Sequence, residues 1–465
     1  MLHDALPLEE LTSLSVLDGR YRSQASPLAS YLSEFSLIRV RIEIETLFLS
    51  ALSKEGIIRK LTTEEKKMLE SLGPETTLED VREIKQIEAR VKHDVKAVEL
   101  FLREKLGATS LRDILEMIHF GLTSEDINNL SYRLMLKRAG ENVLLPAMTS
   151  LLEKICTLAK EQKNTPMLAR THGQPAIPTT LGKEFIVFAD RLAKEMHLLR
   201  EHRFSGKLSG AVGNYNALSI AYQDTDWATF SGSFLRDLGL SQTTATTQTN
   251  TYEDVISFFQ IIQRYNNILI DLDQDMWRYI SDGWFTQEIK KEEVGSSTMP
   301  QKVNPIRFEN SEGNAGMANA FVDFFVRKLP ISRLQRDLSD STVIRNFGSC
   351  LGYSLLAYTA AKDGLERISP NLTKIESDLL SDWSILAEAA QTLLRKNGIT
   401  DPYSLLKNLT RGERISESRW NEIINELPIE TDLKKTLLTL SPKKYIGIAP
   451  QIVDHVLETI EKHYA

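Results

Sequence analysis

The stretch Asp254–Asp282, DVISFFQIIQRYNNILIDLDQDMWRYISD, decides the fold class of this chain. It contains no glycine or proline, and its apolar residues recur at steps of three and four, which is the spacing of one buried helix face. At 1.5 Å per residue, the predicted helix is roughly 40 Å long. Helices of this length pack in bundles, so we expect partners from the same chain or from other copies of it. The apolar positions are Val255, Phe258, Phe259, Ile262, Tyr265, Leu269, Leu272, Met276 and Ile280.

Further long stretches have the same periodicity, and strand signals are scarce, so we predict an all-α protein. The stretches are 141–162, 180–202, 309–328 and 350–367. Towards the end of the chain the periodic segments shorten, and turn signals such as Asp401-Pro402 and Ser441-Pro442 occur. We expect an N-terminal helical domain (1–113), a central helical bundle (114–368) and a small C-terminal helical domain (369–465).

The composition excludes several classes of protein. The chain has 465 residues, of which 42% are hydrophobic and 26% charged, as in ordinary soluble globular proteins. A net charge of -7 argues against general nucleic-acid binding. Cys156 and Cys350 are too few for a disulfide scaffold or a cysteine-rich metal site. Neither a signal peptide nor a membrane span is evident, so we expect a cytoplasmic protein.

The segment Gly295–Pro305, GSSTMPQKVNP, concentrates adjacent hydroxyls, a lysine, an amide and two prolines in eleven residues. Glycine permits unusual backbone angles, and the prolines interrupt regular helix, which predicts an ordered loop within 288–305. Its hydroxyls, its amide and the charge of Lys302 suit an anionic, oxygen-rich ligand. The alternative is a connection between two helices with incidental polar residues.

Two histidines lie in motifs that suit chemistry. His172 lies in a turn with Gly173 and Pro175, before a helix that we expect to open at Thr179 or Thr180. Its imidazole titrates near neutrality, which suits proton transfer, although a lone histidine in a turn is more often a surface residue. We expect His93 to lie on a helix, beside Lys92, Asp94 and Lys96. That run is either a solvated charged face or a cationic wall for a carboxylate or phosphate.

Two further clusters would hold anions. Thr123 or Ser124, followed by acids, predicts a helix N-cap, and the free N–H groups there can also bind a carboxylate. Arg336 and Arg345, with Ser341 between them, suit a phosphate, and Arg20 is a further candidate; surface ion pairs are the alternative for each arginine. The chain has no phosphate-binding glycine loop, dinucleotide fingerprint or convincing metal-ligand spacing, so we expect acid–base chemistry without a metal or cofactor.

These motifs, in this order, resemble the fumarase/aspartase superfamily, and most closely its adenylosuccinate lyase family in the longer bacterial form. The 295–305 segment matches the superfamily signature, and the resemblance extends over nearly the whole chain. The motifs that resemble the family itself are Ser15–Tyr21, His93–Ala97, Thr123–Asn129, Thr171–Ala176, Gly210–Asn216 and Asp340–Arg345.

The resemblance implies a homotetramer with a twenty-helix core and active sites shared between subunits. It implies β-elimination of fumarate from adenylosuccinate, giving AMP, and from succinyl-aminoimidazole-carboxamide ribotide (succinyl-AICAR ribotide), giving AICAR. Ser296 would be the base, His172 the acid and Glu309 the group that orients His172. Lys302 and Asn304 would stabilise the developing carboxylate charge.

The resemblance assigns the remaining residues to substrate binding. Ser297, Thr123, Ser124 and Gln248 would hold the succinyl part, and His93 would support the phosphate or leaving-group region. The phosphate and ribose would meet Arg20, Tyr21, Arg336, Ser341 and Arg345. Further contacts would come from Lys92, Asp94, Val303, Asn310, Thr342, Val343 and Ile344.

The sequence departs from the family pattern at Lys92, at Gln301 and at 249–252, which bears on binding detail rather than on the chemistry. Two alternatives stay open. One is another lyase of the superfamily, such as argininosuccinate lyase or fumarase, which the arginine cluster disfavours. The other is a non-catalytic helical assembly protein. It is disfavoured by the joint presence of five residues: His172, Ser296, Lys302, Asn304 and Glu309.

Overall fold

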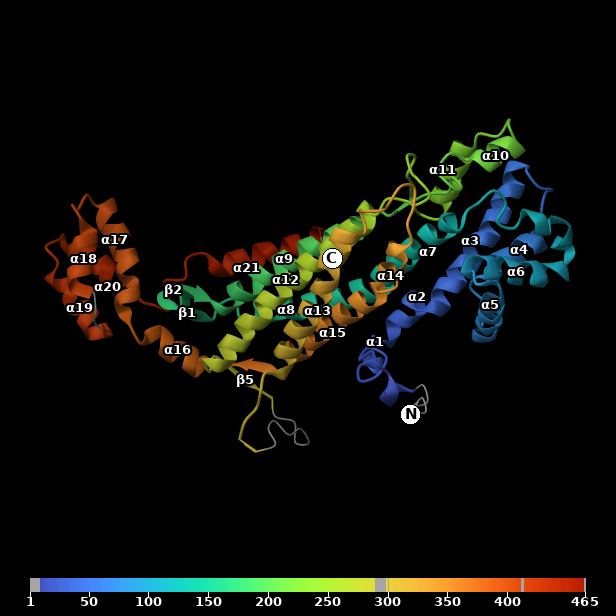
Figure 1. Cartoon of the computed structure of the whole chain (residues 1–465). Coiled ribbons are helices and arrows are strands. Elements are labelled where there is room, and N and C mark those ends of the chain that lie inside the picture. Colours follow the sequence, from blue (N-terminus) through green and yellow to red (C-terminus); the bar gives the residue numbers. More distant parts are fainter. Residues whose placement is uncertain (1–8, 289–297, 300, 411–413, 464–465) are drawn as a thin grey trace. The chain divides into compact units, whose positions relative to one another are not determined.

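The computed structural model describes residues 9–288, 298–299, 301–410 and 414–463, and these residues are mostly helical (Figure 1). The predicted helical class is therefore confirmed. The described part of the chain also contains six short strands, which pair into three two-stranded sheets. None of the described helices is long and apolar enough to cross a membrane.

The chain divides into two compact units. Unit 1 comprises residues 1–147, 198–266 and 314–357, and unit 2 comprises residues 148–197, 267–313 and 358–465. The boundaries fall inside the long helices, so each of these helices contributes to both units. They are α8 (Leu145–Glu161), α9 (Leu181–Glu201), α12 (Glu253–Ser281), α13 (Ile306–Lys328) and α15 (Phe347–Glu366).

Helix α12 is the helix that the opening stretch predicts, and its apolar face is buried. Phe259, Tyr265 and Leu272 have no exposed surface. In unit 1, the ring of Phe259 packs against Phe325 and Phe347 at centroid distances of 5.0 and 4.9 Å. Burying a side chain of this size contributes about 1.5–3 kcal/mol. The hydrophobic effect on this face therefore holds the long helices together, as the periodicity predicts.

In unit 1, α3 (Glu34–Glu55) is central, and α4, α6 and α7 pack on it. The Ser33 side chain caps its start by accepting from the Ser36 N–H, and Gly56 ends it in the left-handed region at φ 80°. The other elements of unit 1 are α1 (Arg22–Ala25), α2 (Ala29–Leu32), α4 (Thr63–Leu72), α5 (Leu78–Val91), α6 (Asp94–Gly107), α7 (Ser124–Ala139), α10 (Asn216–Ala221), α11 (Trp227–Asp237), α14 (Ser339–Ile344), β3 (Ser205–Gly206) and β4 (Ser241–Gln242).

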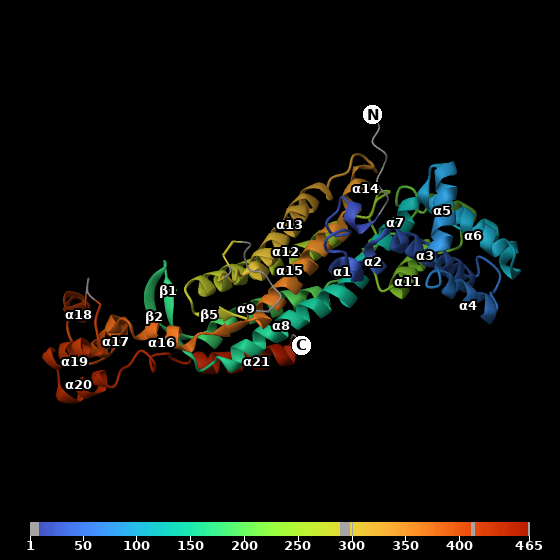
Figure 2. The ribbon, with the colours of Figure 1, turned by 90° about the horizontal axis from the view of Figure 1, so that it is seen from below.

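In unit 2, helices α17 to α20 lie together (Figures 1 and 2). Their shared core contains the fully buried Trp420. A second feature is the antiparallel hairpin of β1 (Pro166–Thr171) and β2 (Gln174–Thr180). The other elements of unit 2 are β5 (Phe285–Gln287), β6 (Ile368–Pro370), α16 (Leu372–Leu380), α17 (Ala387–Lys396), α18 (Pro402–Thr410), α19 (Glu417–Glu426), α20 (Thr431–Leu438) and α21 (Ala449–His463).

Local structure differs from the sequence prediction at two places. Residues 166–180 form a hairpin rather than a simple turn, because prolines are tolerated in a sheet of only two strands. At the second place, Lys92 ends α5 in the left-handed region (φ 58°) and His93 caps α6. The prediction of one helix through Lys92 and Lys96 is therefore wrong, and the break turns His93 and Asp94 towards the cavity described below.

Candidate active site

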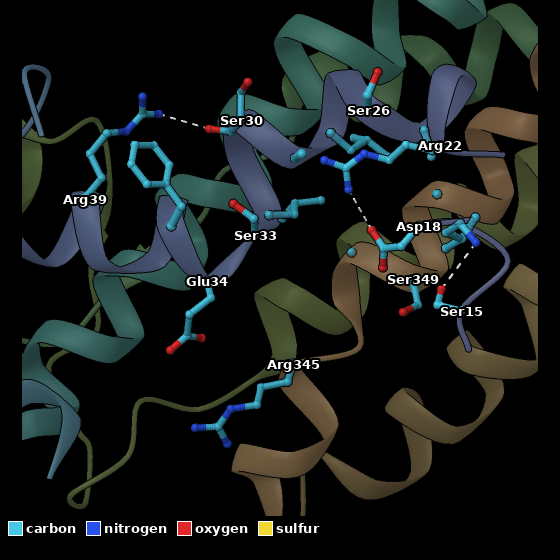
Figure 3. Close-up of a pocket in the computed structure, with 18 of the residues that line it drawn as sticks. Ser15, Asp18, Arg22, Ser26, Ser30, Ser33, Glu34, Arg39, Arg345 and Ser349 are labelled. Atoms are coloured by element: carbon cyan, nitrogen blue, oxygen red, sulfur yellow. Dashed lines mark hydrogen bonds and ion pairs between the residues drawn. The ribbon is translucent and has the colours of Figure 1, made fainter. Parts of the chain in front are cut away.

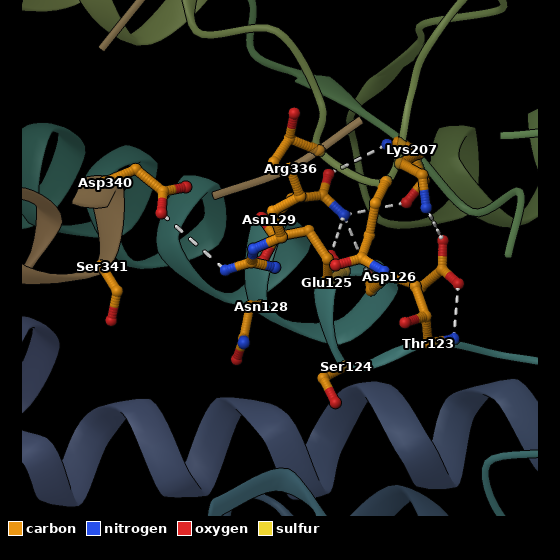
Figure 4. A network of polar contacts seen from close by, with 12 residues as sticks. Thr123, Ser124, Glu125, Asp126, Asn128, Asn129, Lys207, Arg336, Asp340 and Ser341 are labelled. Atoms are coloured by element: carbon orange, nitrogen blue, oxygen red, sulfur yellow. Dashed lines mark hydrogen bonds and ion pairs between the residues drawn. The ribbon is translucent and has the colours of Figure 1, made fainter. Parts of the chain in front are cut away.

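The start of α7 is anchored by one carboxylate. Thr123 is the N-cap, and its backbone N–H donates to Asp126 Oδ2 at 2.8 Å. Asp126 Oδ1 accepts from the Lys207 ammonium at 2.7 Å and from the Ser209 N–H at 2.9 Å (Figure 4). Asp126 thereby ties the helix start to the segment after β3. The predicted N-cap is confirmed, and Thr123 and Ser124 are placed on a fixed backbone.

Lys207 and Asp126 form a fully buried ion pair, with both side chains at 0% exposure. Lys207 Nζ also donates to the Gly210 carbonyl at 2.7 Å. The Asn129 side chain completes the network, since it accepts from the Lys207 N–H at 2.9 Å and donates to the Lys207 carbonyl at 2.9 Å. A buried charge pair is stable only when further hydrogen bonds support it. Here the Gly210 carbonyl accepts from Lys207, and the Ser209 N–H donates to Asp126.

A cavity of about 980 Å³ lies beside this helix start, in unit 1. In Figure 4, the side chains of Ser124, Asn128 and Ser341 point to the same side of the network. The cavity gathers predicted site residues from segments far apart in the sequence, namely Lys92, His93, Asp94, Thr123, Ser124, Gln248, Arg336, Ser341, Ile344 and Arg345. Thr342 and Val343 belong to the same helix, α14, but are not among the lining residues.

The His93 ring is held in one orientation. Its Nδ1 accepts a hydrogen bond from the Lys96 backbone N–H at 3.1 Å, so this nitrogen carries no proton. Its Nε2 lies 3.4 Å from the Ser124 hydroxyl. With its Nδ1 engaged by the Lys96 N–H, the ring presents Nε2 to the Ser124 hydroxyl on the wall of the cavity.

Charged pairs line the same cavity. Arg336 Nη1 donates to Glu125 Oε2 at 2.7 Å, and Arg41 Nη2 donates to Asp94 Oδ2 at 2.7 Å. Burial raises the pKa of Glu125, an effect that the charge of Arg336 opposes. For Asp94, burial also disfavours the carboxylate, but the charge and hydrogen bond of Arg41 outweigh it and lower the pKa.

A second cavity of about 770 Å³ adjoins the first, since Glu34 and Arg345 line both (Figure 3). The Arg345 guanidinium donates to the hydroxyl and the carbonyl of Ser341, so the arginine side chain folds back against the last turn of α14. Arg20 and Tyr21 line neither cavity; the guanidinium lies 5.9 Å from the centre of the Tyr21 ring. Their neighbours Asp18 and Arg22 line the second cavity and pair at 3.0 Å.

In unit 2, His172 lies at the tip of the β1–β2 hairpin and is exposed. His172 (φ 52°) and Gly173 (φ 72°) form a two-residue turn, with Thr171 and Gln174 paired on either side. Left-handed angles at both central residues match the right-handed twist of the strands, which explains the need for glycine here. The turn presents the imidazole to solvent on a defined backbone.

The end of the signature segment lies at the start of α13. The Lys302 N–H donates to the Met299 carbonyl at 3.1 Å, and the Val303 carbonyl accepts from Gln287 at 3.0 Å. Lys302 is exposed and Asn304 is half-buried. Glu309 and Asn310 are exposed in the first turns of α13, and Glu309 Oε1 accepts from the Trp277 indole at 3.2 Å. Ser296 and Ser297 lie outside the described residues.

Several residues that line the cavity were not predicted from the sequence. One signal was present for Arg41, a charged residue within the apolar run of α3 whose side chain is 3% exposed. The others have no local signature, because their contacts are made with distant segments. These lining residues are Glu34, Arg41, Lys85, Glu88, Glu125, Asn128, Tyr132, Asp337 and Leu338.

The fold is shared with solved lyases and related enzymes. The chain superposes with a TM-score of 0.74 on a fumarate lyase from Mesorhizobium sp. BNC1, at 19% identity, covering 93% of this chain and 97% of the other. The same TM-score, 0.74, relates it to 3-carboxy-cis,cis-muconate lactonizing enzyme from Pseudomonas putida, at 17% identity and with 95% and 98% of the two chains covered. Sequence identities this low support a shared fold and carry no conclusion about function.

Sequence relatives are much closer. Residues 19–319 match the family model described as "Lyase", and residues 332–446 match "Adenylosuccinate lyase C-terminal". The chain is 44% identical to adenylosuccinate lyase of Haemophilus influenzae, over 97% of this chain and 99% of that one. It is 42% identical to the Escherichia coli K12 enzyme, with 97% and 100% covered, and 44% identical to that of Dictyostelium discoideum, with 96% and 98% covered. The chain therefore belongs to the adenylosuccinate lyase family, the carbon–nitrogen lyases of that name in purine biosynthesis.

Proposed function

We propose that this chain cleaves adenylosuccinate to AMP and fumarate, and succinyl-AICAR ribotide to AICAR and fumarate. One observation carries the proposal: a single cavity in unit 1 gathers the hydroxyls of Thr123 and Ser124, the imidazole of His93 and the cations Lys92 and Arg345. This set suits a ligand that has both carboxylates and a phosphate.

In the proposed binding mode, the N-terminus of α7 meets a succinyl carboxylate. Free N–H groups and the positive end of the helix dipole favour an anion there, and the Thr123 and Ser124 hydroxyls add donors. Gln248, which lines the same cavity, and Ser297 would complete this part of the site. The phosphate and ribose would lie towards α14, at Arg336, Ser341 and Arg345, with Arg20 and Tyr21 closing that end.

In the proposed chemistry, Ser296 removes a proton from the carbon next to a carboxylate. The carbanion that results is a doubly charged aci-carboxylate, which Lys302 and Asn304 stabilise. The C–N bond then breaks, fumarate leaves and His172 protonates the nitrogen. A free serine hydroxyl is a weak base, so Ser296 would act as the alkoxide after releasing its proton to solvent, and the positive charge of Lys302 would stabilise that alkoxide. Glu309 would orient His172 in the assembled site.

We further propose a homotetramer in which subunits share each active site, and the division at residues 113 and 368 into three domains. The exposed position of His172 at a hairpin tip supports sharing, because such a side chain is accessible to another copy. Large apolar side chains exposed on α13, Met317 at 48% and Phe324 at 49%, support burial against partner helices. Light scattering would test the assembly, and a monomeric mass would contradict it.

The reaction is tested with purified protein and adenylosuccinate, by following the change in purine absorbance as AMP forms. Turnover of adenylosuccinate and succinyl-AICAR ribotide is the expected result. Turnover of argininosuccinate in place of both would assign the chain to another lyase activity. No turnover of any succinyl substrate by a folded tetramer would indicate a protein that has kept the fold and lost the reaction.

A further inference from the structure

The charges that line the cavity of about 980 Å³ beside the start of α7 balance one another, although the proposed substrate is strongly anionic. Arginine and lysine side chains are matched by an equal number of acids. What decides where a phosphate binds is which of the cations have a carboxylate beside them. A cation that is paired with a carboxylate attracts a phosphate less strongly than an unpaired cation does. The lining cations are Arg41, Lys85, Lys92, Arg336 and Arg345.

Three of these cations are paired. Arg41 contacts Asp94 at 2.7 Å, and Arg336 contacts Glu125 at 2.7 Å. Lys85 lies 3.1 Å from Glu34 and 2.7 Å from Glu88. The ion pair between Arg336 and Glu125 is shielded from water, because only 17% of the Arg336 side chain and 4% of the Glu125 side chain are exposed.

The remaining two cations are Lys92 and Arg345. Among the described residues, neither has a carboxylate at ion-pair distance, and the Arg345 guanidinium donates to Ser341 instead. Lys92 is exposed and stands in the left-handed region at φ 58°, where a side chain other than glycine, asparagine or aspartate is uncommon. Lys92 stands at the junction of α5 and α6 and is one of the residues that line the cavity.

We propose that Glu125 is a positioning residue that cancels the charge of Arg336, so that, of the five cations that line this cavity, Lys92 and Arg345 are the two that hold the substrate's dianionic phosphate. Arg336 then donates directed hydrogen bonds to an uncharged oxygen of the same ligand, such as a ribose hydroxyl. This inference rests on the proposed function, because it names the charge pattern that the cavity applies to a purine nucleotide.

The geometry around Arg336 supports this role for Glu125. Arg336 Nη2 also lies 3.8 Å from Asp340, and Asp340 Oδ2 accepts a hydrogen bond from Tyr252 at 2.8 Å. Two carboxylates therefore flank one guanidinium, which gives the group a fixed direction and no net positive charge. An uncompensated arginine in the same place would bind the AMP product as strongly as the substrate, and would slow its release.

The first test replaces Glu125 by glutamine, which keeps the hydrogen bond to Arg336 and removes the negative charge. For Glu125→Gln we expect AMP to bind at least about fivefold more tightly by calorimetry, with a steeper dependence on salt. The KM for adenylosuccinate should fall in parallel. Glu116→Gln is the matched control, because it removes an acid of an ion pair (with Arg103) whose members do not line the cavity, and AMP affinity should not change.

Adenosine binding distinguishes an effect on the phosphate from an effect on the rest of the nucleotide, because adenosine lacks the phosphate. Glu125→Gln should leave adenosine binding unchanged. Lys92→Met should weaken AMP about fivefold, reduce the salt dependence, and also leave adenosine unchanged. A Glu125→Gln protein that folds as judged by circular dichroism but binds AMP no more tightly overturns the inference. So does a Lys92→Met protein with unchanged AMP affinity, which decides the matter if Glu125→Gln does not fold.

The two proposals fail in different ways. If the wild-type protein does not convert adenylosuccinate, the proposed function itself is wrong. If it does, and the variants show no opposite shifts in AMP affinity, only the role of Glu125 and Lys92 is wrong.

Discussion

The start of α7 and the tip of the β1–β2 hairpin both carry groups proposed to act on the substrate, yet they are built in opposite ways. At the start of α7, Asp126 and Lys207 are completely buried, and further hydrogen bonds to the Gly210 carbonyl and from the Ser209 N–H support the pair. At the hairpin tip, His172 is exposed on two residues in the left-handed region. The binding groups are pre-organised by one unit of the chain, whereas the proposed acid is presented to solvent.

Because of this difference, we expect substitutions in the two regions to cause different defects, a loss of stability in one and a loss of turnover in the other. The buried network at the start of α7 both positions the binding groups and stabilises the fold, so removing one partner leaves an uncompensated buried charge and lowers stability. An exposed turn residue contributes little to packing, so its loss affects the reaction alone. We therefore expect substitutions at the start of α7 to change the free energy of unfolding, and substitution of His172 to change turnover.

The largest expected effect follows from breaking the buried pair. Lys207→Met should lower the free energy of unfolding by about 3–5 kcal/mol, because Asp126 is left as a buried, unpaired carboxylate. Denaturant unfolding measures the loss. The control is Lys54→Met, which removes an exposed lysine (76% of the side chain) 3.7 Å from Asp237 and should change stability by less than about 0.5 kcal/mol. Equal small losses for both variants would show that the network does not stabilise unit 1.

The hairpin is tested by His172→Ala, which should lower turnover at least about 100-fold, a typical contribution of a general acid. Its melting temperature should match that of the wild type, because the side chain is exposed. His455→Ala, the same change at an exposed histidine of α21, serves as the control and should retain full activity. Wild-type turnover in His172→Ala would remove this histidine from the mechanism.

The ion pair of Asp254 with Arg133 links α12 to α7 and gives a pH-dependent test. Burial disfavours the Asp254 carboxylate, but Arg133 at 2.8 Å outweighs this effect and lowers its pKa from 3.8. A lowered pKa means that the stabilisation is complete above the unfolded value and is lost as the pH falls through the folded one.

We therefore expect Asp254→Asn to be less stable than the wild type by about 1.5–3 kcal/mol at pH 7. This difference should begin to shrink below about pH 4, where Asp254 of the unfolded chain takes up a proton, and should be lost as the pH falls through the lower pKa of the folded state. Unfolding curves across this range measure it. Asp432→Asn, an exposed change (93% of the side chain), should show no such pH dependence. A difference that stays constant with pH would argue against the ion pair as its source.

The smallest effect is expected at Gly173. Its φ of 72° is strained for residues with a Cβ atom, although nothing lies within 4 Å of the position that a Cβ would occupy. Gly173→Ala should therefore lower stability by about 1 kcal/mol through backbone strain alone. Asparagine tolerates this region, so Gly173→Asn should be close to wild type in thermal unfolding. A larger loss in Gly173→Asn than in Gly173→Ala would contradict the turn geometry.

The sequence predicted the helices well where the signal is local. The periodic stretch at 254–282 became α12 within one residue at each end, because an amphipathic stripe and uninterrupted propensity act over neighbouring turns. The stretch at 141–162 became the shorter α8, because a π-helical turn at Gly140–Leu144 precedes it. The Lys92 junction and the hairpin were missed, since a left-handed lysine and two paired strands rich in proline have no clear local pattern.

The sequence by itself determined the helical class, the family and the set of polar residues that suit an anionic substrate. Only the tertiary structure decided how the charges of those residues are used. Arg336 and Glu125 are 211 positions apart, yet they lie 2.7 Å from each other. The physical reason is that helix formation depends on neighbours in sequence, whereas the charge state of a cavity depends on which distant side chains packing brings together.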